Sequence, residues 1–405
     1  MKAIPRVLAR LLINIASWPL YAFSIISLRD KNVWVFGSWF GHRYTDNSRY
    51  LFEFVSSNCP DIRSVWLTRD VEIVNHLRAE GREAYPTASL RGFLIACRAG
   101  VSVLTGGERD VNAIAISKSK RVVLFHGTPL KKIKHDDKLH EHAGRPMWFR
   151  VLRGAYRSVF PFLRERWDLI ISTSETVSRR LVSAFQVPEA QVVVTGSPRG
   201  DIILRRPPQP SSVIERLRSE RGYKRIILYA PTHRLEGRGE ADFIAQLPFE
   251  KCRALLNHYG AALLIKAHFY HRDAPGSDGE LVAPIHRLSE ADAPDINVLL
   301  PHTDILITDY SSVFYDFLLL DRPIIFAPFD LTTYLTEDRE LYEPYETATP
   351  GPKCHSWDDV LIALRSVLSG QDEYVRERRS VRARTNAFVD TNNCARIVRA
   401  VKAIA

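Results

Sequence analysis

The stretch Asp304–Asp330, DILITDYSSVFYDFLLLDRPIIFAPFD, contains the pattern that decides the fold. Ile305–Thr308 has the length and apolar composition of a buried parallel strand. Val313–Leu320 is apolar nearly all round, which is typical of a short helix buried between a sheet and its neighbours. Asp321–Pro323 ends that helix, and the apolar run Ile324–Ala327 predicts the next strand. The stretch is therefore predicted to fold as strand, turn, helix and strand.

The turn inside this stretch carries three residues that favour helix N-caps, Asp309, Ser311 and Ser312. Free backbone N–H groups, two hydroxyls and the positive end of a helix dipole would together suit a phosphate. A plain serine cap without a ligand explains the same residues equally well. Taken alone, the turn does not decide between these two interpretations.

The composition is that of a folded globular protein with a surplus of basic residues. At 405 residues the chain is long enough for two domains, and 45% apolar and 25% charged residues exclude a disordered chain. The formal net charge of +10 suits a polyanionic substrate, an anionic membrane surface or nucleic acid. The five cysteines are scattered and never form a CxxC pair, which favours a reducing compartment and argues against structural zinc.

Residues 1–31 form a basic and apolar N-terminal segment. Leu11–Leu28 contains no formal charge and is flanked on both sides by lysine and arginine. Its length is marginal for a transmembrane helix, and Pro19 and several polar residues weaken that interpretation. We expect a segment that lies in the membrane interface, with its basic flanks attracted to anionic lipid. The alternative is a first helix packed on the protein's own core.

From Asn32 onward, β-branched or aliphatic runs alternate with helical patterns, which predicts parallel sheets with helices on both faces. The strands predicted in the first half are Val33–Phe36, Ser64–Thr68, Val101–Thr105, Val122–Phe125, Leu169–Thr173 and Gln191–Thr195. The proline-rich residues 205–210 predict a linker. Strands are then predicted at Arg225–Tyr229, Ala262–Ile265, Ile296–Leu299, Ile305–Thr308 and Ile324–Ala327. The polar residues 371–395 predict a terminal helix. Because such folds bind ligands beyond the carboxyl ends of strands, the residues that follow strands are the candidates for a site.

The segment HGTPLK, residues 126–131, follows one of these predicted strands. Thr128 as N-cap and Pro129 as first helical residue predict a helix start, and Gly127 allows backbone to approach a ligand closely. His126 lies where it could accept a proton near neutral pH. A lone histidine is more often buried at a sheet edge, so it is the combination with glycine, proline and lysine that favours a functional turn.

Three more turns follow predicted strands. Arg199, in GSPRGD, could reach an anion across a gap between domains or pair with Asp201 on the surface. Arg234, in APTHR, offers the planar set of donors that suits bidentate phosphate contacts. Lys266 and His268 follow the strand predicted before them. Together the turns place two histidines and several cations where a phosphate-rich ligand held between two domains would need them.

No metal site is predicted. His135-Asp136-Asp137 lies in a charged loop without a matching cluster, so a solvated surface is the simpler interpretation. The sequence contains no P-loop, no Gly-x-Gly-x-x-Gly and no His-Glu-x-x-His motif. Basic residues are mostly spread along the chain rather than gathered on one element with interleaved aromatics, which argues against a basic nucleic-acid-binding or membrane-binding protein without catalysis.

Several of these segments together resemble the CDP-glycerol glycerophosphotransferase family, which includes teichoic-acid primases and polymerases and related capsule enzymes. In order, the segments are HGTPLK (126–131), GSPRGD (196–201), LYAPTHR (228–234), KAH (266–268), TDYSSVFYDFLLLDRPIIFAPFD (308–330) and PGP (350–352). HGTPLK and the block at 309–330 are the specific parts of the resemblance. The chain departs from the family's pattern at Gly200, His233 and Phe269, where the family usually has Asn, Phe and Pro.

The resemblance implies an α/β fold of GT-B type, with two Rossmann-like, doubly wound domains that face each other across a cleft. It divides the chain into a membrane-associating segment (1–31), an acceptor domain (32–204), a linker (205–215), a CDP-donor domain (216–370) and a helical tail (371–405).

The resemblance also implies that glycerol phosphate, or ribitol phosphate in some members, moves from a CDP-activated donor to a hydroxyl of an acceptor, with release of CMP. By motif, His126 resembles the family's catalytic base and His268 its second active-site histidine. Donor-binding roles fall on Thr232, Arg234, Lys266, Asp309, Ser311 and Ser312, and further cleft contacts on Gly127, Lys131 and Arg199.

The expected partners are CDP-glycerol, a lipid-linked acceptor of the undecaprenyl type and an anionic membrane surface, and nucleic acid is not expected. Members of the family are peripheral proteins that act at the cytoplasmic face of the bacterial membrane. It has no obligatory cofactor, and a requirement for Mg²⁺ is left open. Two enzymatic alternatives stay open as well: a ribitolphosphotransferase that uses CDP-ribitol, and a GT-B glycosyltransferase that uses a nucleotide sugar.

Overall fold

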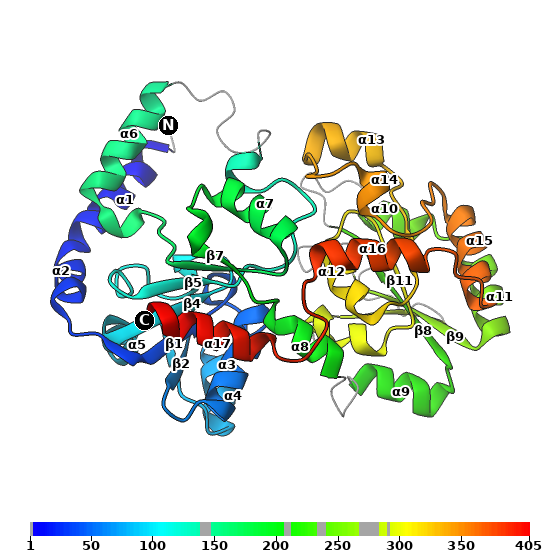
Figure 1. Ribbon diagram of the computed structural model, residues 1–405, viewed down its shortest axis with the longest axis horizontal. Coiled ribbons are helices and arrows are strands. Elements are labelled where there is room, and N and C mark those ends of the chain that lie inside the picture. Colours follow the sequence, from blue (N-terminus) through cyan, green and yellow to red (C-terminus); the bar gives the residue numbers. More distant parts are fainter. Residues whose placement is uncertain (1–2, 138–146, 206–211, 233–239, 267–282, 290–291) are drawn as a thin grey trace.

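The computed structural model describes the chain except for residues 1–2, 138–146, 206–211, 233–239, 267–282 and 290–291. Two parallel β-sheets lie side by side, each covered by helices (Figure 1). We call the part built on the seven-stranded sheet the first lobe and the part built on the five-stranded sheet the second lobe. The α/β architecture with two parallel sheets agrees with the sequence-based prediction.

The first lobe has the strand order β3-β2-β1-β4-β5-β6-β7, and every neighbouring pair is parallel. Its strands are β1 (Asp30–Gly37), β2 (Arg63–Thr68), β3 (Ala84–Pro86), β4 (Ala99–Leu104), β5 (Lys120–Val123), β6 (Leu169–Ser172) and β7 (Val192–Val194). Its helices include α3 (Asp46–Asn58), α4 (Val71–Ala79), α5 (Leu90–Arg98) and α7 (Glu175–Phe185). Because side chains alternate along a strand, Trp34 packs into the core on one face of the sheet and Val35 into the core on the other.

The second lobe has the parallel strand order β10-β9-β8-β11-β12. Its strands are β8 (Arg225–Ala230), β9 (Ala261–Ile265), β10 (Ile285–Arg287), β11 (Ile305–Thr308) and β12 (Ile324–Phe326). Its helices include α9 (Ser212–Arg221), α10 (Glu240–Ala245), α11 (Phe249–Tyr259), α12 (Val313–Phe317), α13 (Leu331–Thr333), α14 (Tyr345–Ala348) and α15 (Trp357–Leu368). α8 (Pro198–Arg205) lies at the boundary with the first lobe (Figure 1). The stretch that opened the sequence analysis forms β11, α12 and β12, as predicted.

The C-terminal part differs from the single helix predicted within 371–395. It forms two helices, α16 (Val375–Thr385) and α17 (Asn393–Ile404). α16 lies on the second lobe, whereas α17 crosses back to the first, where Ile397 is fully buried in the core (Figure 1). The carboxylate of Asp201 accepts hydrogen bonds from the N–H groups of Asn393 and Cys394 at 2.8 and 2.9 Å. This cap fixes the start of α17, so the tail ties the two lobes together.

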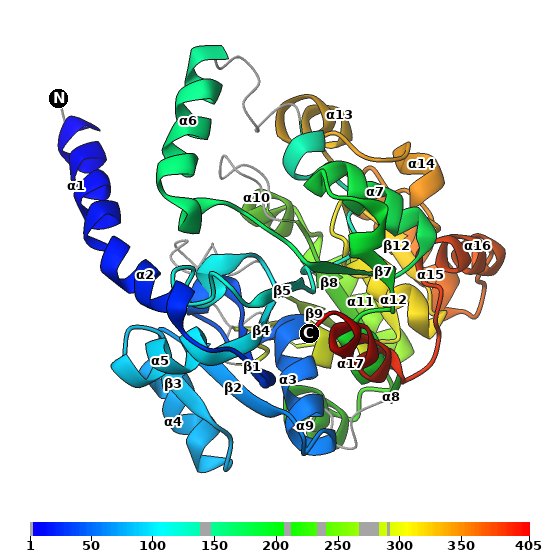
Figure 2. The ribbon, with the colours of Figure 1, turned by 60° about the vertical axis from the view of Figure 1, so that its left-hand side comes forward.

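The N-terminal segment forms α1 (Ala3–Ala16) and α2 (Trp18–Ile26), which lie at one edge of the first lobe together with α6 (Met147–Val159) (Figures 1 and 2). Leu8–Ile26 is long and apolar enough to cross a membrane, and 6% of it is buried. That exposure does not fit the alternative of a helix packed on the core. α2 is nevertheless anchored to the lobe, because the buried Ser24 hydroxyl donates to the Ala115 carbonyl at 2.8 Å.

Two local predictions are wrong. Ile296–Leu299, predicted as a strand, begins with the 3₁₀ helix Ile296–Val298, because the Asp295 carboxylate accepts from the Asn297 N–H at 2.9 Å and caps the turn. Thr128 does not begin a helix. Instead, residues 130–132 pair with residues 340–342 of the second lobe, with N–H to carbonyl distances of 2.8 and 3.0 Å. This pairing satisfies backbone groups that a helix would otherwise have used.

Candidate functional site

The carboxyl ends of β5 and β11 face each other across the boundary between the lobes. Gly127 follows β5 and Ser312 follows β11, and a side-chain carbon added at Gly127 would lie 3.0 Å from Oγ of Ser312. The φ angle of Gly127 is +145°, which residues with a side chain rarely adopt. The backbone conformation therefore favours glycine, and an added side chain would also press on Ser312. The structure brings the HGTPLK segment and the serine turn together.

His126 lies at this boundary as a neutral base. Its ring lies beside Trp39 and Phe125, with centroid distances of 5.5 and 4.2 Å. The side chain keeps access to solvent, but the surrounding protein still removes water from the charged form of the imidazole. This desolvation, followed by the charges of Arg199 and Arg339, lowers the pKa of His126 to about 4. His126 is thus uncharged at pH 7 and able to accept a proton.

The cations around His126 come from both lobes. Lys131 belongs to the HGTPLK segment and adds to the lowering of the His126 pKa. Its ammonium lies 5.5 Å from the ring centre of Tyr334, and its backbone bridges to Leu341 of the second lobe. Arg339 comes from the same part of the second lobe. Positive charge concentrated around a neutral base suits an anionic substrate.

Asp309 and Thr232, both predicted to bind the donor, bond to each other. The Thr232 hydroxyl and N–H donate to Oδ1 of Asp309 at 2.6 and 2.8 Å, and the Tyr310 N–H donates to the same oxygen at 2.6 Å. The Tyr345 hydroxyl donates to the Asp309 carbonyl at 3.1 Å. Asp309 is buried. These contacts join the ends of β8 and β11 and thereby fix the serine turn.

The remaining predicted donor-side residues in the described part of the chain lie at the same edge of the second sheet. Ser311 and Ser312 are half-buried, and Ser311 Oγ accepts a long 3.5 Å bond from the Val313 N–H. Lys266 is half-buried at the end of β9, and its ammonium donates to the Ser289 carbonyl at 3.4 Å. At 3.5 Å, the bond to the Ser311 hydroxyl is at the long end of the hydrogen-bond range.

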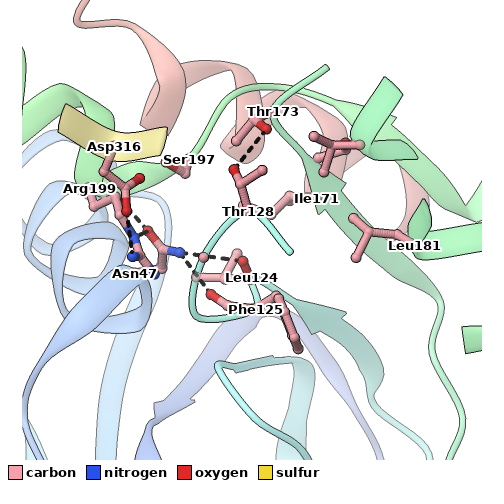
Figure 3. Close-up of a pocket in the computed structure, with 13 residues that line it drawn as sticks. Asn47, Leu124, Phe125, Thr128, Ile171, Thr173, Leu181, Ser197, Arg199 and Asp316 are labelled. Atoms are coloured by element: carbon pink, nitrogen blue, oxygen red, sulfur yellow. Dashed lines mark hydrogen bonds and ion pairs between the residues drawn. The ribbon is translucent and has the colours of Figure 1, made fainter. Parts of the chain in front are cut away.

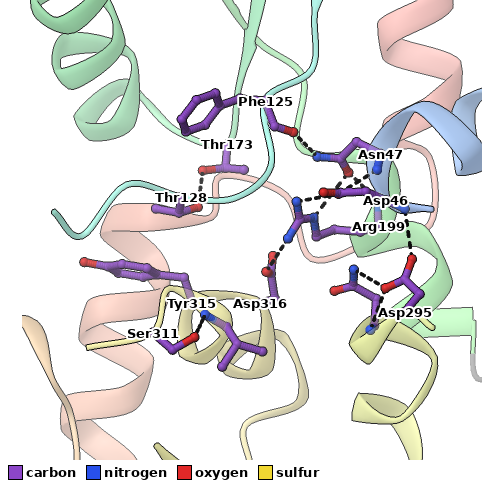
Figure 4. A network of polar contacts seen from close by, with 12 residues as sticks. Asp46, Asn47, Phe125, Thr128, Thr173, Arg199, Asp295, Ser311, Tyr315 and Asp316 are labelled. Atoms are coloured by element: carbon purple, nitrogen blue, oxygen red, sulfur yellow. Dashed lines mark hydrogen bonds and ion pairs between the residues drawn. The ribbon is translucent and has the colours of Figure 1, made fainter. Parts of the chain in front are cut away.

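Arg199 is buried at the lobe boundary, so the alternative of a surface pair with Asp201 is wrong. Its Nη2 donates to Asp46 of α3 at 2.6 Å and its Nη1 to Asp316 of α12 at 3.0 Å (Figure 4). Although burial opposes its charge, Asp46 and Asp316 raise the pKa of Arg199. Burial also raises the pKa of Asp46 to about 6, against the effect of the guanidinium. Asp201 caps α17 instead.

A small pocket lies behind the Gly127 turn, between β6 and Arg199 (Figure 3). The hydroxyls of Thr128 and Thr173 meet there at 3.3 Å. The pocket is lined by Asn47, Leu124, Phe125, Gly127, Thr128, Ile171, Ser172, Thr173, Val177, Leu181, Ser197, Arg199 and Asp316. Its lining combines apolar side chains with polar ones that bond to each other at the lobe boundary.

His268 and Arg234 lie outside the described residues, so the roles predicted for them stay predictions. The same holds for a second imidazole facing His126. Within the described ranges, no group of three or more His, Cys, Asp or Glu side chains is arranged to hold a metal ion.

The sequence analysis missed Trp39, Asn47 and Asp316. Trp39 follows β1, and its φ angle of +46° is unusual for a residue with a large side chain. Its place in the turn that follows the predicted strand Val33–Phe36 was the available signal. Asp316 is the one carboxylate within the apolar run Val313–Leu320, and a charge in a buried helix implies a buried partner. That partner is Arg199.

Comparisons with known proteins agree with the resemblance. The family model described as CDP-Glycerol:Poly(glycerophosphate) glycerophosphotransferase matches residues 20–403. The chain is 28% identical over 367 residues to a teichoic acid glycerol-phosphate transferase of Staphylococcus aureus. The matched region covers 88% of this chain and 89% of that transferase. It is 33% identical over 200 residues to the teichoic acid ribitol-phosphate polymerase TarL of Staphylococcus aureus, over 47% of this chain and 34% of that polymerase.

Among solved structures, the wall teichoic acid polymerase TagF superposes with a TM-score of 0.75 at 21% identity, over 98% of this chain and 97% of that one. This likeness shows the fold, a GT-B-like pair of α/β units, and confirms the predicted fold class.

Proposed function

The chain belongs to the CDP-glycerol:poly(glycerophosphate) glycerophosphotransferase family and is a CDP-glycerol glycerophosphotransferase, and from this premise we propose how its site works and what it modifies. It transfers glycerol phosphate in teichoic acid synthesis, the process named for the similar Staphylococcus aureus transferase. The observation that carries the proposed mechanism is the close approach of Gly127 to Ser312. Through it, a neutral histidine of one lobe and a hydroxyl-rich turn of the other border the same gap.

His126 is the proposed general base. The acceptor hydroxyl gives its proton to His126 while its oxygen attacks the phosphorus next to the glycerol. The bond between that phosphorus and the CMP oxygen breaks, and CMP leaves with the electron pair and the added negative charge. Such a transfer depends on alignment of the two oxygens and on compensation of charge rather than on covalent help from the protein.

The second lobe is proposed to hold the donor. The hydroxyls of Ser311 and Ser312 and the ammonium of Lys266 lie at the carboxyl edge of its sheet, where α/β folds bind nucleotides. The half-buried position of these groups supports this role, because hydroxyls and an ammonium at this edge can donate hydrogen bonds to a diphosphate. Arg234 and His268 are assigned to the leaving CMP by their motifs alone.

The acceptor is proposed to be a polyol phosphate or glycan carried on a lipid, presented to the first lobe. Lys131 and Arg339 support an anionic acceptor, since both place positive charge near His126. Mass analysis of the product formed on a defined acceptor distinguishes the addition of one unit from the addition of many.

CDP-ribitol is the second candidate donor, because a ribitol-phosphate polymerase shares 33% identity with this chain over 200 residues. A thermal-shift comparison of CDP-glycerol, CDP-ribitol and UDP-sugars separates the candidates, since a ligand that binds the folded state raises its melting temperature. Stabilisation by CDP-ribitol alone would mean that the donor is CDP-ribitol rather than CDP-glycerol. Stabilisation by UDP-sugars alone would favour a glycosyltransferase.

We propose that the enzyme works at the cytoplasmic face of the membrane as a peripheral protein. Ile13 of α1 and Trp148 of α6 are 64% and 62% exposed, and large apolar side chains exposed on neighbouring helices favour contact with lipid. Asn14 donates to the Tyr156 hydroxyl at 2.6 Å, which links the two helices. α1 and α6 are therefore proposed to enter the membrane interface together.

The proposed mechanism assigns no step to a resident metal ion. Transfer activity is expected to persist in EDTA after removal of divalent cations. Activity that requires Mg²⁺ would instead mean that the donor binds as a magnesium complex.

The central test replaces His126 with alanine and measures CMP release from CDP-glycerol in the presence of a lipid acceptor. Loss of a general base should lower kcat about 10²-fold or more, while binding of CDP-glycerol, measured by calorimetry, is retained. His355→Ala serves as the control, because His355 is an exposed histidine of the second lobe that contacts none of the site residues described above. A loss of only a few-fold in His126→Ala would remove His126 from the role of base.

A further inference from the structure

Asn47 connects the buried arginine of the lobe boundary to the strand end that carries His126. It lies in the first turn of α3 and is fully buried. Its Oδ1 accepts from the backbone N–H and Nε of Arg199 at 3.0 and 3.3 Å. Its Nδ2 donates to the Phe125 carbonyl at 2.8 Å (Figures 3 and 4). The amide oxygen of Asn47 thus bonds to Arg199, and its amide nitrogen bonds to the segment before His126.

The Phe125 carbonyl belongs to the peptide group that leads into His126. Phe125 has a φ angle of +52°, a left-handed conformation that is costly for an aromatic residue. Strained backbone of this kind persists where surrounding contacts impose it, and such sites are common next to active residues. The hydrogen bond from Asn47 is a contact that can impose it. A change at Asn47 can therefore reach the backbone that carries His126.

The other end of the connection reaches the serine turn. Arg199 donates to Asp316, which lies in α12 directly after Ser311 and Ser312. A continuous series of hydrogen bonds thus runs from α12 through Arg199 and Asn47 to the residue before His126 (Figure 4). Its members come from both lobes, and the side chains of Asn47, Arg199 and Asp316 are buried.

We propose that Asn47 and Arg199 are positioning residues that set His126 at the correct distance from the donor held by the serine turn. This inference rests on the proposed role of His126 as base and adds the residues through which the second lobe orients it. Transfer between two oxygens requires alignment within a fraction of an ångström, and a misplacement of about 1 Å can cost about 10²-fold in rate. The contribution of Asn47 should therefore appear in kcat rather than in donor affinity.

The test compares Asn47→Ala with Asn297→Ala in the full-length protein. Asn297 is a matched control, because it is also buried at the lobe boundary and its amide donates to Asp295 at 2.8 Å. Asp295 in turn accepts from the Asp46 N–H of α3 at 2.9 Å. Asn297 thus belongs to the same contact between lobes, but none of its hydrogen bonds is to the Phe125 segment.

Asn47→Ala is expected to lower kcat for CMP release at least about tenfold and to leave KM for CDP-glycerol within about threefold. Asn297→Ala is expected to lower the melting temperature without that fall in kcat. Equal values of kcat in the two variants, or an unchanged kcat in a folded Asn47→Ala protein, would overturn the proposal.

If Asn47→Ala does not fold, Asn47→Asp provides the second variant. Aspartate has the same shape and still accepts from Arg199, but it cannot donate to the Phe125 carbonyl when ionised. The same fall in kcat is expected, and wild-type kcat would overturn the proposal. Failure of the proposed function would look different, because the wild-type protein itself would then release no CMP from CDP-glycerol.

Discussion

The Thr232 hydroxyl donates a 2.6 Å hydrogen bond to Oδ1 of Asp309 and so joins the ends of β8 and β11 in the second lobe. The Thr232 N–H donates to the same oxygen. Both residues were predicted to touch the donor. Their contacts show that they also build the turn on which Ser311 and Ser312 stand, so a substitution there acts on the site through the fold.

Thr232→Val is expected to destabilise the protein by about 1.5–3 kcal/mol, because it removes a buried hydrogen bond to a charged acceptor while keeping the shape of the side chain. Urea denaturation measures this free energy of unfolding. Thr232→Ser keeps the hydroxyl and should lose less. An unfolding free energy of Thr232→Val equal to wild type would show that this bond does not hold the turn.

The pH dependence of the reaction should report the unusual state of His126. Desolvation and nearby cations lower its pKa to about 4, and a base works only when deprotonated. We therefore expect kcat/KM to stay nearly constant from pH 8 down to about 5 and to fall at more acidic pH. A free histidine would lose activity near pH 6.5 instead. A wild-type profile that falls near pH 6.5 would contradict the assignment.

Lys131→Gln extends this prediction. Removing a cation that lowers the His126 pKa should move the acidic fall of kcat/KM to higher pH. Lys132→Gln is the matched control, since Lys132 is the next residue and its ammonium pairs with Glu340 at 3.1 Å. Profiles measured by CMP release that shift equally in both variants would mean that Lys131 has no specific effect on the base.

Gly127→Ala tests the contact between the lobes. The added methyl group would meet Ser312 Oγ at 3.0 Å on a backbone with a φ angle of +145°. We expect a loss of about 1–3 kcal/mol in stability and a lower kcat/KM, because the two turns are forced apart. Gly154→Ala in α6 is the control. Beyond the helix's own backbone, no atom lies within 4 Å of its added carbon, and alanine in a helix should stabilise by about 0.5–1 kcal/mol. Wild-type stability and kcat/KM in Gly127→Ala would contradict the tight contact.

The sequence predicted correctly those parts of the fold whose structure is determined by residues close together along the chain. Ile305–Thr308, Val313–Leu320 and Ile324–Ala327 show their strand and helix patterns locally, and the structure forms them in place. The short strands Ala84–Pro86 and Ile285–Arg287 lack enough residues to show such a pattern. They exist because a longer neighbouring strand supplies the hydrogen bonds.

The candidate site also has features that the sequence shows and features that only the fold brings together. Glycine, histidine and serine at strand ends are visible in the sequence, and so is their chemistry. The partners of Arg199 are not visible, because Asp316 and Asp46 lie 117 and 153 residues away along the chain. From the sequence alone, the nearby Asp201 was the visible candidate partner. In the folded protein, Asp201 instead accepts from the Asn393 N–H.

Membrane binding should depend on the apolar helices at the edge of the first lobe. Ile13→Glu in α1 removes apolar area and adds a negative charge, so we expect binding to vesicles that contain anionic lipid to weaken about tenfold or more. Trp148→Glu in α6 should act in the same direction, because Asn14 and Tyr156 link the two helices. Co-sedimentation with vesicles measures the effect.

Ile362→Glu in α15 is the control for this measurement. Ile362 is 69% exposed, much like Ile13, but α15 lies at the opposite end of the molecule on the second lobe (Figure 1). If membrane contact is confined to the edge formed by α1, α2 and α6, Ile362→Glu binds vesicles as the wild type does. Equal weakening in all three variants would indicate an effect of net charge, since each adds one negative charge. Wild-type binding in Ile13→Glu and Trp148→Glu would remove these helices from the membrane interface.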